Sequence, residues 1–129
     1  DEYQHPVLTF IRRDGSKDTQ YCKSKLFNQD YKKVLLWRSG YLNPTYENGS
    51  CGVGNNIHYA IVETEEEGLN LEKLYQSDLY KFIFSICAFS QYNNGRIMNW
   101  LHRKNPQYED IYEYLNLDEE EKDFVINNL

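Results

Sequence analysis

The stretch Lys33-Val34-Leu35-Leu36-Trp37-Arg38 is a short apolar run that ends at Ser39-Gly40. Apolar runs of this length, bounded by turn residues, are typical of β-strands. The polar segment that follows, from about Asn43 to Asn56, has four glycine or proline positions and several asparagines, and it predicts a long loop. The next segment, Ile57–Val62, predicts another strand, so that the loop joins two strands.

Residues on the N-terminal side of this stretch predict a hairpin. Val7–Arg12 alternates around apolar and β-branched residues, and Asp14-Gly15 is a strong signal for a hairpin turn. Thr19–Cys22 is then the expected returning strand. The first half of the chain therefore predicts a mostly antiparallel sheet.

The second half predicts helices. Apolar residues recur at helical spacing from Leu71 to Cys87, with Asn70 as the expected N-cap, and Glu65–Gly68 is expected to be an acidic turn before it. Leu69 and Leu74 are spaced as a hydrophobic staple.

Three shorter helical predictions follow toward the C-terminus. One covers Ile97–Leu101 and is bounded by Pro106, and a second covers Glu109–Tyr114. Asp118 with Glu121 resembles a capping box and predicts a last helix to about Asn127.

These patterns predict one α+β domain over residues 1–129, with a β-rich platform and a long loop in 1–64 and a helical half in 69–129. Because the chain starts at Asp1 and its only methionine is Met98, we expect it to be a domain cut from a larger protein.

Charge is distributed unevenly along the chain. The net charge is −6, but residues 1–46 hold eight basic and five acidic residues, whereas residues 105–129 hold one lysine and eight acidic residues. This asymmetry leaves nucleic-acid contact to one face near the N-terminus. The three cysteines are widely spaced, which favours reduced thiols in the cytoplasm or nucleus. No apolar run approaches the roughly 20 residues needed to cross a bilayer, and no signal peptide is visible.

Asn43-Pro44-Thr45-Tyr46 is similar to the segment with which adenine methyltransferases hold a flipped base. However, no glycine-rich loop follows a strand to hold a methyl donor, so loop chemistry is the favoured interpretation. The three histidines lack metal-ligand spacing. We therefore expect no catalytic residue, no cofactor and no metal in this chain.

Basic and aromatic residues alternate between Arg12 and Tyr41. Cationic side chains neutralise phosphates and aromatic rings stack on bases, although an ordinary solvated face with core aromatics has the same pattern. The basic members are Arg12, Arg13, Lys17, Lys23, Lys25, Lys32, Lys33 and Arg38, and the aromatic ones are Tyr21, Phe27, Tyr31, Trp37 and Tyr41.

The order of segments resembles the C-terminal, TaqI-like specificity region of restriction–modification adenine-N6 DNA methyltransferases. Three stretches carry this resemblance and cover most of the chain from about Lys32 onward. They are Lys32–Tyr41 followed by Pro44–Gly49 and Gly52–Gly54, then Glu67–Leu71 leading to Leu74–Leu79, and lastly the acidic close Ile111–Glu121.

The resemblance implies a target-recognition domain that reads double-stranded DNA. A separate N-terminal catalytic domain of the same cytoplasmic protein would bind S-adenosylmethionine and transfer the methyl group. Because the chain is acidic overall, that domain would supply much of the phosphate contact. Lysine and arginine would hold phosphates or guanine edges and asparagines would pair with adenine edges. The expected DNA-binding residues are Lys32, Lys33, Arg38, Ser39, Tyr41, Asn43, Tyr46, Asn48, Asn55 and Asn56.

Two alternatives stay open at this point. The acidic helix from Asp118 to Asn127 would suit a protein-interaction module, or a mimic of DNA that blocks a DNA-binding protein. A small enzyme is the third possibility, and it rests mainly on Asn43-Pro44-Thr45-Tyr46.

Overall fold

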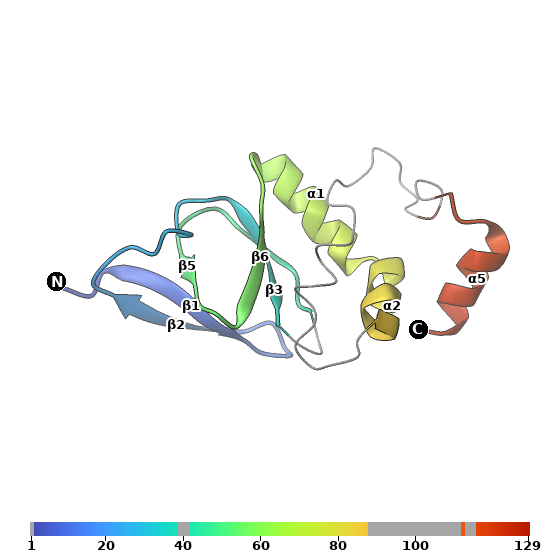
Figure 1. The fold of residues 1–129 in the computed structure, drawn as a ribbon, viewed down its shortest axis with the longest axis horizontal. Coiled ribbons are helices and arrows are strands. Elements are labelled where there is room, and N and C mark those ends of the chain that lie inside the picture. Colours follow the sequence, from blue (N-terminus) through green and yellow to red (C-terminus); the bar gives the residue numbers. More distant parts are fainter. Residues whose placement is uncertain (1, 39–41, 88–111, 113–115) are drawn as a thin grey trace.

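The computed structural model describes residues 2–38, 42–87, 112 and 116–129. It confirms an α+β fold, with strands in the first half and helices in the second (Figure 1). The strands are β1 (His5–Ile11), β2 (Lys17–Cys22), β3 (Lys33–Trp37), β4 (Thr45–Glu47), β5 (Gly52–Val53) and β6 (Ile57–Ile61), and the described helices are α1 (Glu65–Gln76), α2 (Asp78–Cys87) and α5 (Glu119–Asn127).

The strands form two three-stranded sheets, in the orders β2-β1-β5 and β4-β3-β6. The predicted hairpin is confirmed: β1 and β2 pair antiparallel, with Ile11 opposite Lys17 and Gly15 in the turn at a φ of 91°. Only β1 and β5 pair parallel among the described strands. The predominance of antiparallel pairing agrees with the sequence-based prediction.

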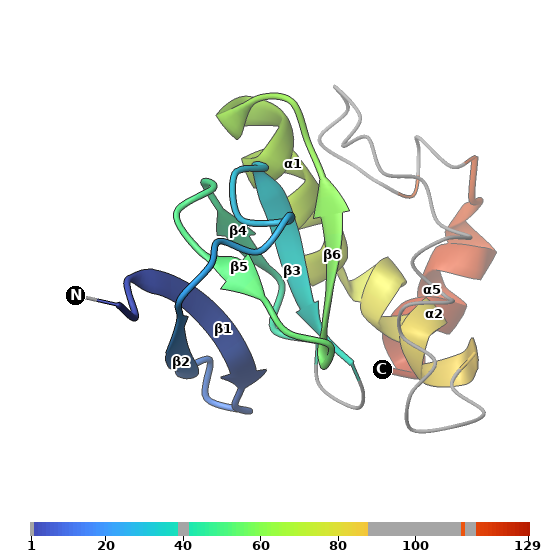
Figure 2. The same cartoon turned by 60° about the vertical axis from the view of Figure 1, so that its left-hand side comes forward.

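The sheet β4-β3-β6 is the middle layer of the molecule, as Figure 2 shows. Every residue of β3 is buried, because successive side chains of a strand point to opposite faces and both faces are covered. Val34 and Leu36 pack with the helices, and Leu35 and Trp37 pack with residues of β1 and β5. This explains why the run beginning at Lys33 is continuously apolar rather than alternating.

The prediction that the polar segment 43–56 is one long loop is wrong. It contains β4, which pairs with β3, and β5, which pairs with β1, so this segment passes from one sheet to the other. The pairing depends on contacts with residues far away in the sequence, and the many glycines and asparagines of the segment concealed it.

The first helix begins earlier than the sequence predicted. Thr64 is its N-cap and accepts a hydrogen bond from the amide of Glu67 at 3.1 Å, so Glu65–Glu67 form the first turn and Asn70 lies inside the helix. The acidic residues were expected in a turn, but at a helix N-terminus they complement the helix dipole. The predicted stripe also divides at Ser77 into α1 and α2.

The last helix agrees with its prediction. Asp118 is the N-cap of α5 and accepts a hydrogen bond from the amide of Glu121 at 2.8 Å. The helix predicted over 97–101 lies outside the described residues, as does the one over 109–114 except for Tyr112, which is buried.

Among the described residues, no helix is long and apolar enough to span a membrane. That part of the chain also contains no cluster of three potential metal ligands. Cys22 and Cys51 are free thiols.

Candidate nucleic-acid interface

Two aromatic rings from different sheets meet at one end of the β layers. Phe10 near the end of β1 lies against Trp37 at the end of β3, with 4.5 Å between ring centroids and 47° between ring planes. A register irregularity between Leu8 and Phe10 interrupts the alternation of β1 at this point. Phe10 is 39% exposed and Trp37 is buried, so this pair has one face toward solvent.

An arginine lies over each ring of this aromatic pair. The guanidinium carbon of Arg12 lies 5.9 Å from the centroid of the Phe10 ring, and that of Arg38 lies 5.5 Å from the Trp37 ring. Both distances suit a cation–π contact. Arg13, which is exposed, follows Arg12 at the hairpin turn. We call Phe10, Arg12, Arg13, Trp37 and Arg38 the arginine cluster.

Two of the predicted asparagines hold the arginine cluster in place. The side-chain amide of Asn43 donates to the main-chain oxygens of Arg12 at 2.5 Å and Arg13 at 3.1 Å. Its backbone has a φ of 44°, a region that asparagine tolerates better than most residues. Asn56 accepts a hydrogen bond from Nη1 of Arg38 at 2.7 Å. Asn43 and Asn56 therefore orient the arginines from opposite ends of segment 43–56.

Acidic side chains of the hairpin partly offset this positive charge. Asp18 forms an ion pair with Arg12. Asp14 accepts hydrogen bonds from the Ser16 hydroxyl at 2.6 Å and the Ser16 amide at 2.9 Å, and these bonds lower the pKa of Asp14. The cluster and its hairpin neighbours nevertheless hold four basic side chains, Arg12, Arg13, Lys17 and Arg38, against the two aspartates.

Lys33, which we had expected to contact DNA, is instead a core residue. Its side chain is 0% exposed, and Nζ lies 2.6 Å from Oε2 of Glu47. Nζ also donates to the carbonyl oxygens of Cys51 at 2.9 Å, Tyr31 at 3.0 Å and Gln29 at 3.2 Å. The expectation is wrong because an ammonium enclosed by four acceptors has no surface to offer to a phosphate.

Glu47 completes this buried ion pair. It accepts hydrogen bonds from the amides of Gly49, Ser50 and Cys51 and from the Ser50 hydroxyl. Burial alone would raise the pKa of Glu47, but the hydrogen bonds from Lys33, Ser50 and Gly49 outweigh burial and lower it. The pair has a structural role: it fixes the turn 47–51 to β3.

Tyr46 also faces inward, contrary to its expected role at the DNA surface. A Cβ added to Gly68 would lie 2.3 Å from Cδ1 of Tyr46, so the ring lies directly on the backbone of α1. Burial, with the negative charges of Glu65 and Glu47, raises the pKa of Tyr46. The ring is half-buried against the helix. The Asn43 amide is likewise engaged, so the two side chains of Asn43-Pro44-Thr45-Tyr46 that would hold a flipped base contact the protein itself.

The other predicted residues are exposed or lie outside the described part. Lys32 and Asn55 are exposed. Asn48 is exposed and accepts a hydrogen bond from the Ser50 amide at 3.1 Å. Ser39 and Tyr41 are among the residues that the structure does not describe. The structure thus brings three of the predicted residues together: Arg38, Asn43 and Asn56.

A second aromatic position, Phe27, is 80% exposed although its neighbours are held firmly. The side-chain nitrogen of Asn28 donates to the main-chain oxygen of Val53 at 3.1 Å, and its side-chain oxygen accepts from the Val53 amide at 3.0 Å. The side-chain nitrogen of Gln29 donates to the main-chain oxygen of Ser50 at 3.2 Å. Phe27 is therefore presented to solvent by an anchored segment.

Sequence reasoning singled out Arg12, Arg13 and Arg38 as basic residues but did not group them, and it missed Phe10. Arg13 precedes Arg38 by 25 positions in the sequence, and the contact between Phe10 and Trp37 joins their two strands. The available signal was the hairpin turn at Asp14-Gly15, which places both Arg12 and Arg13 at one tip of the sheet.

No protein-family model, no curated protein and no solved structure matches this chain. The candidate interface is therefore argued from its own residues and contacts.

Proposed function

We propose that this chain is a DNA target-recognition module and that the arginine cluster is its contact surface. The observation that supports this proposal most is the convergence of Arg12 and Arg38 on the Phe10–Trp37 pair, with Arg13 beside them. Arginine forms paired hydrogen bonds with the guanine edge and with phosphate, and an aromatic base gives its guanidinium a defined orientation.

The distribution of charge supports the same surface. The cluster lies beside the turn of the β1–β2 hairpin, near the middle of the long axis, whereas α5, with its acidic first turn, lies toward one end of that axis (Figure 1). A polyanion would approach the hairpin end and be repelled by α5. The uneven distribution of charge would then favour one orientation on DNA, although the overall charge of −6 weakens binding.

Within this proposal the parent protein is an adenine-specific DNA methyltransferase of a restriction–modification system, located in the cytoplasm. S-adenosylmethionine would be bound by a separate N-terminal catalytic domain, and the present chain would contribute the choice of sequence. The inward orientation of Tyr46 and the engaged amide of Asn43 agree with a non-catalytic role for this chain.

Selection from a random pool of duplex DNA at low salt tests this function. The purified chain is expected to retain duplexes that share a short common sequence, and Arg38→Gln is expected to relax that preference. Retention without any common sequence would contradict target recognition, because phosphate contacts alone carry no sequence information.

A variant of a distant basic residue provides the control. Lys81→Gln removes one positive charge from exposed Lys81 on α2. It should leave both retention and the selected sequence unchanged. An equal loss in Lys81→Gln and Arg38→Gln would indicate that only overall charge matters.

A further inference from the structure

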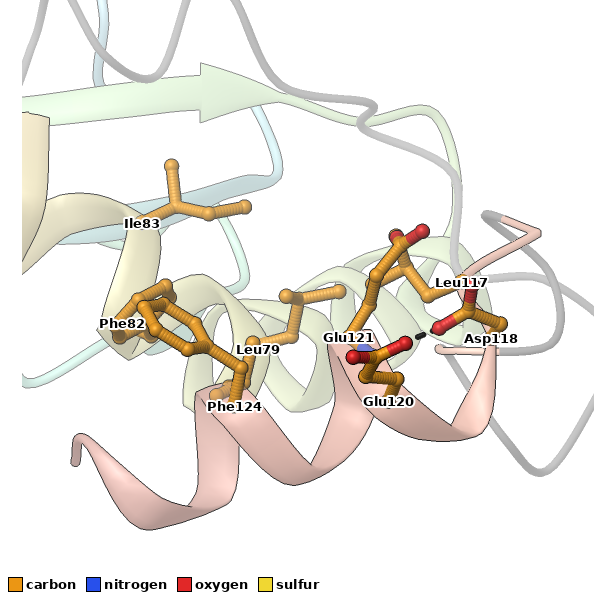
Figure 3. A pocket seen from close by; sticks show the side chains of 9 residues that line it. Leu79, Phe82, Ile83, Leu117, Asp118, Glu120, Glu121 and Phe124 are labelled. Carbon is orange, nitrogen blue, oxygen red and sulfur yellow. Dashed lines mark hydrogen bonds between the residues drawn. The ribbon is translucent and has the colours of Figure 1, made fainter.

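An apolar groove lies between α2 and α5, two helices that contribute no residue to the arginine cluster. Its volume is about 540 Å³, and Figure 3 shows side chains of both helices directed into it. Leu79 and Val125, which are both buried, lie at its base. Its other lining residues are Phe82, Ile83, Leu117, Asp118, Glu120, Glu121 and Phe124.

The groove is apolar along one side and at its base. Phe82 and Phe124 meet edge to face, with 5.9 Å between ring centroids. Phe124 is nevertheless 61% exposed, so much of its ring faces solvent. Ile86, one turn beyond Phe82 on α2, is 63% exposed and extends the apolar surface past the groove.

The opposite end of the groove is acidic. Asp118, Glu120 and Glu121 belong to its lining, and Figure 3 shows the two glutamates beside Leu117, away from Phe124. The single basic residue of α5, Lys122, lies with Nζ 5.3 Å from the ring centroid of Tyr112. Asp118 is held by its cap bond to the Glu121 amide, so within the described part of the chain Glu120 and Glu121 are the lining carboxylates outside this cap.

We propose that this groove binds a cationic amphipathic helix of a partner protein. Its apolar side chains, spaced three or four residues apart, would pack between Phe82, Ile83 and Phe124. Its lysines or arginines would pair with Glu120 and Glu121. Apolar area gives such a helix-in-groove contact its affinity, and the acidic rim selects a basic partner and fixes its orientation. This interaction is independent of the proposed DNA contact.

A synthetic helical peptide of leucine and lysine, with leucines at i, i+3, i+4 and i+7, is a suitable probe. Its binding to the purified chain can be followed by fluorescence anisotropy at physiological salt. Phe124→Ala should weaken binding about tenfold, since aromatic anchors dominate such contacts. Glu120→Lys should weaken it by a similar factor. A scrambled peptide of the same composition should bind more weakly than the patterned one.

Two matched variants distinguish the groove from general charge or hydrophobicity. Glu66→Lys makes the same charge change as Glu120→Lys. Glu66 is the second residue of α1, just as Glu120 is the second residue of α5. Phe27→Ala removes another exposed phenylalanine that does not line the groove. Both should bind the peptide as the unaltered chain does.

Several outcomes would overturn the proposal. The first is a loss of peptide affinity in the control variants as large as that in Phe124→Ala or Glu120→Lys. The others are an unchanged affinity in Phe124→Ala, and a scrambled peptide that binds as tightly as the patterned one. Dimerisation that Phe124→Ala abolishes, seen by sedimentation, would assign the groove to a second copy of the chain. Because Phe124 is exposed, circular dichroism should show that Phe124→Ala keeps its fold.

Discussion

Nζ of Lys33 lies 2.6 Å from Oε2 of Glu47 in a fully enclosed position between β3 and the turn that follows β4. Two residues that the sequence places in separate segments therefore form one buried ion pair. The ammonium also holds main-chain oxygens of Gln29, Tyr31 and Cys51, so this contact ties three parts of the chain together.

Lys33→Met should destabilise the fold by about 3–5 kcal/mol, because it leaves the Glu47 carboxylate buried without its counter-ion. The double variant Lys33→Met with Glu47→Gln should lose less than the two single changes added together, since no unpaired charge remains. Urea denaturation followed by circular dichroism measures all four proteins. A loss below about 1 kcal/mol for Lys33→Met would show that the pair is solvated rather than buried.

The same pair makes stability depend on pH. Because the pKa of Glu47 is lowered in the fold from its ordinary 4.5, its contribution is fully present above that pH and is lost as the pH falls through the lower, folded value. The unaltered chain should therefore exceed Glu47→Gln in stability at pH 7, and the difference should shrink below about pH 4.5. Urea denaturation of both proteins across this pH range measures the difference in their stability. A difference in stability that stays constant down to pH 3 would contradict the lowered pKa of Glu47.

His58 adds a separate dependence at higher pH. Burial lowers its pKa from the ordinary 6.5, so acidification below that value also reduces stability. Since His58 is present in both proteins of the previous comparison, its effect cancels in the difference.

Gly68→Ala should lower the free energy of unfolding even though alanine favours helices over glycine by about 1 kcal/mol. The added methyl would lie 2.3 Å from Cδ1 of Tyr46 and 3.2 Å from Cγ2 of Val62. Overpacking of this kind costs about 1–3 kcal/mol.

In a Tyr46→Ala background the same substitution should become neutral or stabilising, because the clash is removed. Urea denaturation of the four proteins of this cycle decides the point. Gly68→Ala that stabilises the unaltered chain would show that the Tyr46 ring does not rest on α1.

Sequence patterns predicted the elements whose signals are local. The Asp14-Gly15 turn, the apolar run after Lys33 and the Asp118 cap each depend on neighbouring residues, and all three are confirmed. Strands β4 and β5 were missed, because Thr45–Glu47 and Gly52–Val53 owe their conformation to pairing with β3 and β1.

The candidate site was only partly predictable for a related reason. Lys33 and Arg38 are the basic residues at the two ends of the same apolar run, and nothing in the neighbouring sequence distinguishes them. The buried carboxylate of Glu47 makes one a core residue, whereas the Trp37 ring and Asn56 hold the other at the hairpin end. Residue type predicted a basic surface, but only tertiary contacts decide which cations belong to it.

The central claim, DNA contact through the arginine cluster, is tested most directly by the salt dependence of duplex binding. Arg13→Gln is the most informative variant, because Asn43 holds Arg13 through its main-chain oxygen and the side chain can change without losing that bond. Binding to a 20-base-pair duplex should weaken as salt rises, and Arg13→Gln should reduce the slope of log K against log salt by about 0.9 if Arg13 neutralises one phosphate. Lys81→Gln should leave the slope unchanged. Identical slopes for Arg13→Gln and the unaltered chain, or no binding even at low salt, would contradict the proposed interface.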